Sequence, residues 1–231
     1  MDAFNAVFTP DNINYIMRGF WMTIRVAFVS IIFSIAIGTV LGIVRSYGNF
    51  ILRKLAGFYI ELFRNTPNLL WVFVCFIAAP FPTAFGRACC AYVLFTSAMM
   101  AEVVRGGLNS IPKGQFEAAA SQGFTLASTL WYIVIPQCFR RIIPTMMSQV
   151  ITVIKDTSFL AQVAIGELLF NTKDLMAKLP VYTGQAIGFP EVALLFGFAM
   201  LLYFLLNFTL SCIMRYIQRR NNAATNQHTN G

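Results

Sequence analysis

Charged side chains are scarce in this sequence. Asp, Glu, Lys and Arg make up 11% of the 231 residues, and hydrophobic residues make up 58%. A soluble domain usually carries about 25% charged residues. The shortfall excludes an ordinary soluble domain and indicates a chain embedded in a membrane. The net charge of +8 comes from basic residues scattered between apolar runs, not from the clustered basic face that nucleic-acid binding requires.

Groups suited to catalysis or metal binding are also few. His228, the only histidine, lies in a polar tail, which removes the usual general base and zinc ligand. The 5 cysteines form no Cys-x-x-Cys pair, so neither a disulfide framework nor a metal site is predicted. The sequence also lacks a Gly-x-x-x-x-Gly-Lys-Ser/Thr phosphate loop. We therefore expect no catalytic residue, no metal and no cofactor here; any ATP is expected on another subunit.

Long uncharged runs predict an all-α integral membrane protein with five transmembrane helices in a domain over 20–216. The predicted spans are 24–44, 62–82, 88–108, 142–163 and 192–214. Residues 1–19 are predicted to form an N-terminal interfacial segment, and 217–231 a polar tail without a reason to fold. Acidic residues precede the first basic residue, Arg18, so the N-terminus does not read as a cleavable signal peptide.

Small side chains recur along the first span. Ser30, Ser34, Gly38 and Gly42 fall at every fourth position and form one stripe. Helices in lipid associate by close backbone approach. This stripe therefore predicts a helix–helix contact.

Two pairs of opposite charge are spaced three residues apart. Glu61 and Arg64 can pair on one helix face, next to Thr66-Pro67, which would open the backbone hydrogen bonding. Either this pair is a solvated face, or it touches a zwitterionic solute. Glu102 and Arg105 are expected to neutralise each other in a structural role, because charges in membranes are rarely left alone.

The fourth predicted span is interrupted by Lys155 and Asp156, with Thr157 and Ser158 adjacent. An ionisable pair within an apolar run is costly unless the helix breaks, a cavity is wet or a ligand compensates. One interpretation places the pair on a permeation path. The other ends the helix near Lys155 and leaves the pair at the outer interface.

The distribution of basic residues sets the predicted orientation. The loops 45–54 and 105–141 and the C-terminal end lie on one side and carry ten of them: Arg45, Arg53, Lys54, Arg105, Lys113, Arg140, Arg141, Arg215, Arg219 and Arg220. The other side carries Arg18, Arg25, Arg87, Lys173 and Lys178. More basic residues face the cytoplasm, so the N-terminus is predicted outside and the C-terminus inside.

A short helix is predicted at about 113–122, in the larger cytoplasmic loop. Pro112 suits the first turn of a helix, and Gly123 suits the left-handed position after its end. At about 15 Å the helix is too short to cross a bilayer. Its alanines add little side-chain bulk, so a partner surface could approach the backbone closely. Phe116 supplies an apolar contact and Glu117 a charge. This pattern is typical of a helix that docks in another protein's groove. The alternative is a loop helix packed on its own chain.

The pattern Ile-Pro-x-Gly-x-x-Glu-Ala-Ala-x-x-x-Gly at 111–123, followed by Ile135-Pro136, resembles the EAA loop of bacterial ATP-binding-cassette importer permeases. Other segments are similar to the polar amino-acid uptake branch, the histidine-, glutamine-, glutamate- and arginine-type permeases. They are Glu61-Leu-Phe-Arg64-Asn-Thr66-Pro67, Ala101-Glu102-Val-Val-Arg105-Gly106, Ile135-Pro136-Gln137 and Lys155-Asp156-Thr157-Ser158. The match runs in family order over 20–215. Gln122 and Ala120 depart from the usual leucine and arginine.

The resemblance implies a permease subunit in the bacterial cytoplasmic (inner) membrane that imports a polar amino acid, with glutamine or glutamate suggested by the branch. It implies two ATP-binding-cassette ATPase subunits, a second copy or a sibling permease, and an extracytoplasmic amino-acid-binding protein. ATPase docking is expected at Pro112, Gly114, Gln115, Phe116, Glu117, Ala118, Ala119 and Gly123. Substrate binding is expected at Lys155, Asp156, Thr157, Ser158, Glu61, Arg64 and Thr66.

Two other classes of function remain as alternatives. A self-contained secondary transporter or channel for small polar solutes would need a complete path and its own ion site, and the chain shows no inverted half-repeat. An intramembrane enzyme would need a nucleophile and base or metal ligands, and the sequence offers neither.

Overall fold

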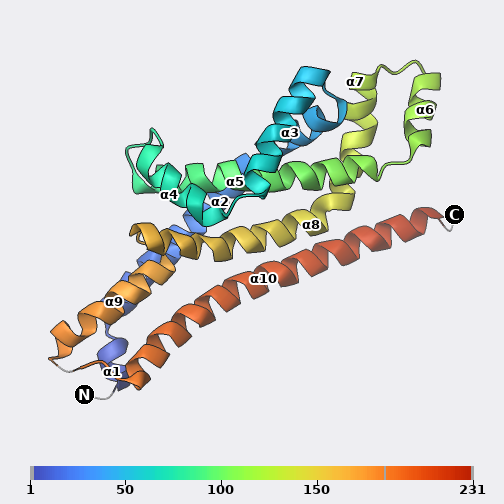
Figure 1. Cartoon of the computed structure of the whole chain (residues 1–231). Coiled ribbons are helices and arrows are strands. Elements are labelled where there is room, and N and C mark those ends of the chain that lie inside the picture. Colours follow the sequence, from blue (N-terminus) through green and yellow to red (C-terminus); the bar gives the residue numbers. More distant parts are fainter. Residues whose placement is uncertain (1–2, 185, 230–231) are drawn as a thin grey trace. The chain divides into compact units, whose positions relative to one another are not determined.

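The structure, a computed structural model, describes residues 3–184 and 186–229, and the secondary structure within them is entirely helical (Figure 1). In chain order the elements are α1 (Ala3–Val7), α2 (Pro10–Tyr47), α3 (Phe50–Arg64), α4 (Asn68–Ala78), α5 (Ala84–Asn109), α6 (Lys113–Ser121), α7 (Leu126–Thr129), the π-helical η1 (Leu130–Val134), α8 (Ile135–Asp156), the 3-10 helix η2 (Thr157–Val163), α9 (Leu168–Thr183) and α10 (Phe189–Thr229).

The chain divides into two compact units, and each unit is built from several stretches of sequence. Unit 1 comprises Met1–Val29, Val72–Cys90 and Ile151–Gly231. Unit 2 comprises Ser30–Trp71 and Ala91–Val150. The long helices α2, α5 and α8 each contribute one part to each unit.

In unit 2, the stripe of small residues on α2 packs against α5, as the sequence predicted. A Cβ added at Gly38 would lie 2.5 Å from the Met100 Cβ, and one added at Gly42 would lie 2.7 Å from the carbonyl oxygen of Ala101. Both distances are shorter than a carbon contact allows. The Ser34 hydroxyl donates to the carbonyl of Val93 at 3.4 Å. The helices therefore approach closely because these positions lack bulky side chains.

The apolar core of unit 2 joins α5 to α8. Its buried members are Met100, Val104, Leu108, Ile111, Val134, Cys138, Ile142 and Met146. Ile35, Ile43 and Tyr47 of α2 pack against this cluster from one side, and Phe116 of α6 packs against it from another. The short helix α6 therefore rests on the same core as the long helices.

Unit 1 is centred on α9, which packs against α1 and α10 (Figure 1). The buried core residues are Val7, Ile16, Leu168, Leu175, Leu179, Leu195 and Ala199. Glu167, fully buried, precedes α9 as its N-cap and accepts hydrogen bonds from the backbone N–H groups of Leu169 and Phe170. The hydroxyl of Tyr203 in α10 donates to the same carboxylate at 3.0 Å.

Three of the predicted spans correspond to long apolar helices. Within the described residues, α2, α5 and the Phe189–Tyr216 part of α10 are long and apolar enough to cross a membrane. The predicted interfacial segment is not separate from the first span, because α2 runs unbroken from Pro10 to Tyr47. No glycine or proline interrupts the sequence between these two ends except the packed glycines 19, 38 and 42.

The predicted span 62–82 is not a single helix. The helix α3 ends at Arg64 and α4 begins at Asn68, so the break falls at Thr66-Pro67, as the proline suggested. The helix α4 has 11 residues, about 16 Å of rise, and is too short to cross the hydrocarbon core alone.

The predicted span 142–163 is divided between α8 and η2. The α-helical hydrogen bonding ends at Asp156 and gives way to a 3-10 helix from Thr157. This change of helix type falls at the interrupting Lys155-Asp156 pair. Ala164 then adopts a left-handed backbone, with φ 53°, and ends the segment.

The C-terminal segment, predicted as a polar tail without a reason to fold, is helical. The helix α10 continues to Thr229. No glycine or proline occurs between 198 and 230 to stop it. Residues 1–2 and 230–231, at the outer limits of the two predicted terminal segments, lie outside the described residues.

We predict that Glu167→Ala lowers the stability of the protein by about 1–3 kcal/mol, because it removes a helix N-cap and the buried carboxylate to which the Tyr203 hydroxyl donates. Glu167→Gln keeps a side-chain acceptor and is expected to lose less than half as much. Thermal unfolding in detergent, followed by tryptophan fluorescence, measures both. An alanine variant that melts at the native temperature would contradict this assignment.

Candidate functional site

The helix α6 forms where the sequence predicted it, over Lys113–Ser121. Pro112 is its N-cap and not its first helical residue, with φ −59° and ψ 139°. Gly123 has φ +79°, and its N–H bonds the carbonyl of Ala120 at 3.0 Å. The N–H of Phe124 bonds the carbonyl of Ala119, also at 3.0 Å. This pair of bonds is the Schellman arrangement, which requires a residue that tolerates a positive φ.

One face of α6 packs on its own chain and the other is free. Ala119 is buried, and Phe116 is half-buried with its ring centroid 6.2 Å from that of Tyr47. Gly114, Glu117 and Ala118 are exposed. The sequence offered two interpretations of this helix, packing on its own chain or docking on a partner. Phe116 supports the first, and the exposed face supplies the surface that the second requires.

Two hydrogen bonds tie the α6 region to α8. The Gln137 side-chain amide donates to the Gln115 carbonyl oxygen Oε1 at 2.9 Å. The Arg141 guanidinium donates to the backbone carbonyl of Ser110 at 2.5 Å. Ser110 lies between α5 and α6, so both ends of this connection are fixed to α8.

After α6 the sequence predicts a second short helix, capped by Thr125 or Ser128, that runs to Ile135 and stops at Pro136. In the structure Thr125 is the cap of α7 and accepts from the N–H of Ser128, but the helix does not stop at Pro136. It continues through the π-helical turn η1 into α8, with the N–H of Ile135 bonding the carbonyl of Leu130. Pro136 has no N–H, and a wider π turn just before it accommodates the missing bond.

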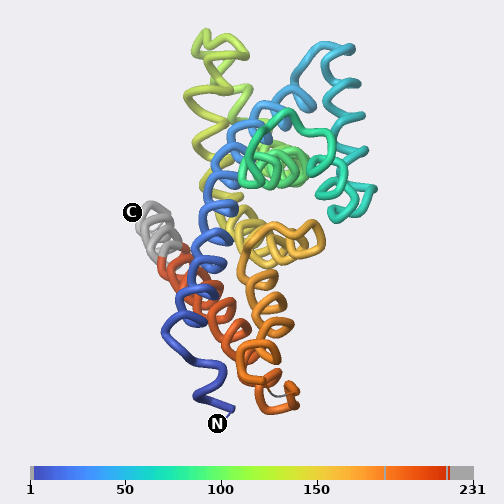
Figure 2. The backbone as a smooth tube through the Cα atoms, turned by 90° about the vertical axis from the view of Figure 1, so that its left-hand side faces the viewer, coloured from blue at the N-terminus to red at the C-terminus, as the bar shows by residue number. Residues whose placement is uncertain are grey.

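An apolar surface beside α6 was not anticipated from the sequence. The chain doubles back between α6 and α7 (Figure 2), and the exposed large side chains here are Phe124, Leu126, Trp131 and Tyr132, with Trp131 and Tyr132 exposed by 68% and 70%. The adjacent aromatic residues Trp131 and Tyr132, within the predicted cytoplasmic loop 105–141, were the available signal. We name these four residues the hairpin apolar surface.

The charged residues predicted to pair within α3 and within α5 form a wider network. Arg105 binds Glu102 as expected, at 2.7 Å. The expected pairing of Glu61 with Arg64 is replaced by two bridges to other helices: Arg45 of α2 binds Glu61 at 3.1 Å, and Arg64 binds Glu102 at 3.2 Å. A pair spaced three apart on one helix gains only a few tenths of a kcal/mol, so this spacing does not exclude a partner on another helix.

Gly57 makes one of these bridges possible. A Cβ at this position would lie 1.5 Å from the Nη1 atom of Arg45. The Arg45 side chain therefore passes over the backbone of α3 to reach Glu61 and the carbonyl of Arg53. Only glycine leaves room for it.

Thr66 lies at the break between α3 and α4. Its hydroxyl donates to the carbonyl of Leu62 at 2.7 Å and accepts from the Trp71 indole N–H at 2.7 Å. The predicted substrate role of Thr66 stays a prediction, and in this structure the hydroxyl is engaged on both sides.

Lys155, Asp156, Thr157 and Ser158 lie in unit 1, at the junction of α8 and η2. Lys155 is exposed and Asp156 is half-buried. Thr157 is fully buried, and its hydroxyl donates to the carbonyl of Ile154 at 2.7 Å. The junction therefore presents an exposed amine and a partly exposed carboxylate where the helix changes type.

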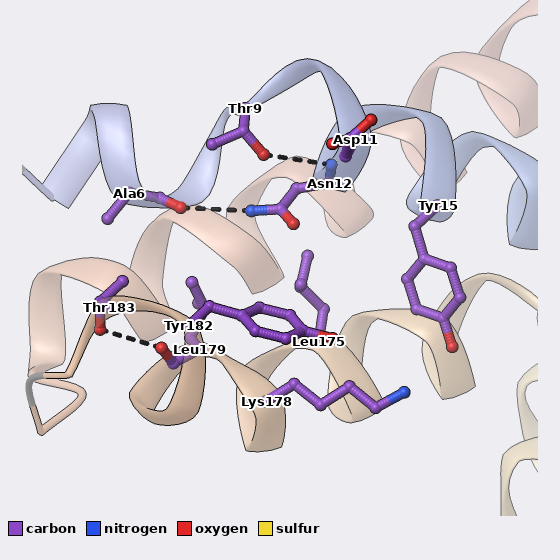
Figure 3. Close-up of a pocket in the computed structure, with 10 residues that line it drawn as sticks. All are labelled: Ala6, Thr9, Asp11, Asn12, Tyr15, Leu175, Lys178, Leu179, Tyr182 and Thr183. Atoms are coloured by element: carbon purple, nitrogen blue, oxygen red, sulfur yellow. Dashed lines mark hydrogen bonds between the residues drawn. The ribbon is translucent and has the colours of Figure 1, made fainter.

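Unit 1 also contains a pocket of about 530 Å³ between the start of α2 and α9 (Figure 3). Lys178 contributes to its wall and binds Asp174 at 2.5 Å, and the Tyr15 hydroxyl donates to the same carboxylate at 2.6 Å. Burial acts to raise the pKa of Asp174, but the hydrogen bonds from Lys178 and Tyr15 outweigh it and lower that pKa below its usual value. The sequence pointed to none of these residues.

The helical fold, with three helices among the described residues that are long and apolar enough to cross a membrane, is that of a membrane component. The family model for the inner membrane component of binding-protein-dependent transport systems matches residues 34–222. The chain belongs to this family, and it is an inner membrane transport component, as the sequence predicted.

Individual relatives cover nearly the whole chain. The probable glutamine ABC transporter permease protein GlnP of Bacillus subtilis (strain 168) is 35% identical over 221 residues, which is 94% of this chain and 98% of that protein. The L-cystine transport system permease protein TcyB of the same organism is 29% identical over 206 residues, 87% of this chain and 84% of that one.

Solved structures share the fold. A crystal structure of an amino acid ABC transporter with histidines has a TM-score of 0.77 at 22% identity and covers 91% of this chain and 95% of its own. The inward-facing MetNI methionine ABC transporter has a TM-score of 0.74 at 17% identity, covering 93% and 99%. At these identities the likeness shows the fold alone.

Proposed function

We propose that this protein is the transmembrane permease subunit of an ATP-binding-cassette importer that moves a polar amino acid into the cytoplasm. The observation that carries the proposal is the 35% identity to a probable glutamine ABC transporter permease across 94% of the chain. Membership of a binding-protein-dependent family does not favour the alternative, a self-contained secondary transporter or channel. Stimulation of ATP hydrolysis in the reconstituted complex by its loaded binding protein, screened across the amino acids, tests the proposal.

The proposed topology has five spans, with the N-terminus outside and the C-terminus inside. The helices α2, α5 and α10 supply three of them. The pair α3–α4 and the pair α8–η2 supply the other two. Broken helices are tolerated in a membrane where protein or a water-filled cavity covers the freed backbone groups. A second permease copy, or a sibling permease, supplies that cover in the proposed assembly.

The proposed contact for the ATPase subunits is the exposed face of α6, with the hairpin apolar surface beside it. The exposed face offers the partner three kinds of contact: bare backbone at Gly114, a charge at Glu117 and a small side chain at Ala118. Phe116 and Ala119 do not touch the partner in this arrangement; they attach α6 to the core of unit 2. Pro112 and Gly123 set the two ends of the helix.

This attachment provides the proposed coupling. When the ATPase pair closes on ATP, a force on α6 passes through Phe116 to α5 and through the Gln115–Gln137 hydrogen bond to α8. Because both helices also line the core of unit 2, they move with α6. Differential contact of the ATPase with the two states is what makes the transport cycle depend on ATP.

We propose Lys155, Asp156, Thr157 and Ser158, all in unit 1, as substrate contacts on the permeation path. Thr66, Glu61 and Arg64 of unit 2 are proposed as a further set of amino-acid contacts. The exposed Lys155 amine suits a carboxylate, and the half-buried Asp156 suits an ammonium group. The shift from α-helix to 3-10 helix at Thr157 adds backbone carbonyls, as broken helices do in other transporters. A binding protein on the outer side delivers the amino acid.

We predict that Lys155→Ala leaves assembly intact but reduces amino-acid uptake about tenfold or more, because a charged hydrogen bond to the substrate is lost. Lys173→Ala, which truncates another exposed lysine of unit 1, is the control and is expected to transport normally. Uptake into proteoliposomes, normalised to ATPase content, measures both. Native uptake by Lys155→Ala would remove this residue from the path.

We predict that Glu117→Arg abolishes stable binding of the ATPase subunits and solute accumulation, because it reverses a charge on the docking face. Ala120→Arg is the matched control: it adds the same side chain about one turn away, at another exposed position of α6. Co-purification of the ATPase with each variant from membranes reports docking. Equal loss in both variants would show that charge at this particular position is not what matters.

A further inference from the structure

A polar cavity of about 490 Å³ lies within unit 2, where α2, α3 and α5 meet. Its lining consists of charged and hydrogen-bonding residues: Arg45, Ser46, Glu61, Arg64, Glu102, Arg105 and Asn109. A cavity with such a lining is unusual in a chain whose residues are 58% hydrophobic. Charges in membrane proteins gather where they line a wet path or a ligand site.

The charges in this cavity do not balance. One carboxylate, Glu102, is shared by two guanidinium groups, with its Oε2 atom 3.2 Å from Arg64 and 2.7 Å from Arg105. Arg45 pairs with Glu61. Three arginines and two glutamates leave one positive charge, and it lies where Arg64 and Arg105 converge.

Both an arginine and a glutamate of this cavity retain hydrogen-bonding capacity. Among the contacts of the described residues, Arg64 reaches Glu102 through Nη1, and a guanidinium has five N–H donors in all. Glu61 contacts Arg45 through Oε1, and its side chain is 65% exposed. Glu61 and Arg64 lie one turn apart on α3, at a Cβ separation of about 5–6 Å. An acceptor and a cluster of donors therefore face the same space.

We propose that this cavity, formed within unit 2, is a second amino-acid site on the cytoplasmic side of the permease. The α-carboxylate binds between Arg64 and Arg105, and the ammonium group binds Glu61. Guanidinium pairs suit carboxylates because of their paired N–H geometry. The inference rests on the proposed function for its ligand and on the proposed topology, which places the flanking loops 45–54 and 105–141 inside.

Such a site would respond to imported amino acid. A ligand bridging α3 and α5 stabilises the arrangement in which these helices are bridged by Arg64 and Glu102. A ligand can shift a conformational equilibrium only through such differential affinity. Amino acid accumulated in the cytoplasm is therefore expected to slow the ATP-driven cycle.

The test uses the permease–ATPase complex in nanodiscs of phosphatidylcholine, without binding protein, and L-glutamine as the probe in saturation-transfer NMR. We expect glutamine to bind, and Arg64→Gln and Asn109→Leu each to weaken binding about tenfold or more. Asn109→Leu replaces a hydrogen-bonding group of the cavity lining with an apolar one and removes no charge. Arg53→Gln, which changes an exposed arginine of α3 outside the cavity, is expected to bind glutamine as the native complex does.

Several results would overturn the inference. Native binding by both Arg64→Gln and Asn109→Leu would place the ligand elsewhere. Loss of the glutamine signal on adding phosphatidylglycerol would assign the cavity to a lipid phosphate. ATP hydrolysis stimulated by loaded binding protein is measured in parallel. If the native complex shows no such stimulation, the proposed function is refuted. If it does show stimulation while both cavity variants bind glutamine as the native complex does, only the second site is refuted.

Discussion

The packing of α6 on the core of unit 2 is the contact on which this account depends. Fully burying a phenylalanine side chain is worth about 1.5–3 kcal/mol, so the half-buried Phe116 ring contributes about 1 kcal/mol. Buried Ala119 allows the helix to approach closely. The side-chain hydrogen bond between Gln115 and Gln137 adds a directional contact between α6 and α8. A helix attached in this way transmits a displacement imposed by a partner to the core, whereas a helix held only by flexible loops would move without the core.

Charge is the second organising constraint. A chain with few charged residues gathers several of them between α2, α3 and α5, where each carboxylate has a guanidinium partner. Exposed ion pairs contribute only about 0–1 kcal/mol each, so stability alone does not explain the cluster. Glycines make this geometry possible: Gly57 lets Arg45 cross α3, and Gly42 brings α2 close to α5.

The sequence predicted the features that depend on local chemistry. The boundaries of α6, the left-handed Gly123, the cap at Thr125 and the small-residue contact on α2 all followed from residue types and spacing. The partners of Glu61 and Arg64 did not, because they come from helices distant in sequence. The passage through Pro136 was also missed, since a π turn that absorbs a proline has no sequence pattern of its own. The substrate contacts stay predictions.

The central claim is that α6 moves with α5 and α8, and the ratio of solute transported to ATP hydrolysed tests it most directly. In the reconstituted complex, Phe116→Ala is expected to retain its ATPase subunits and hydrolyse ATP while transporting fewer solute molecules per ATP. Phe50→Ala, which truncates a phenylalanine exposed by 63%, should keep the native ratio. A native ratio in Phe116→Ala would contradict the claim that this ring carries the coupling.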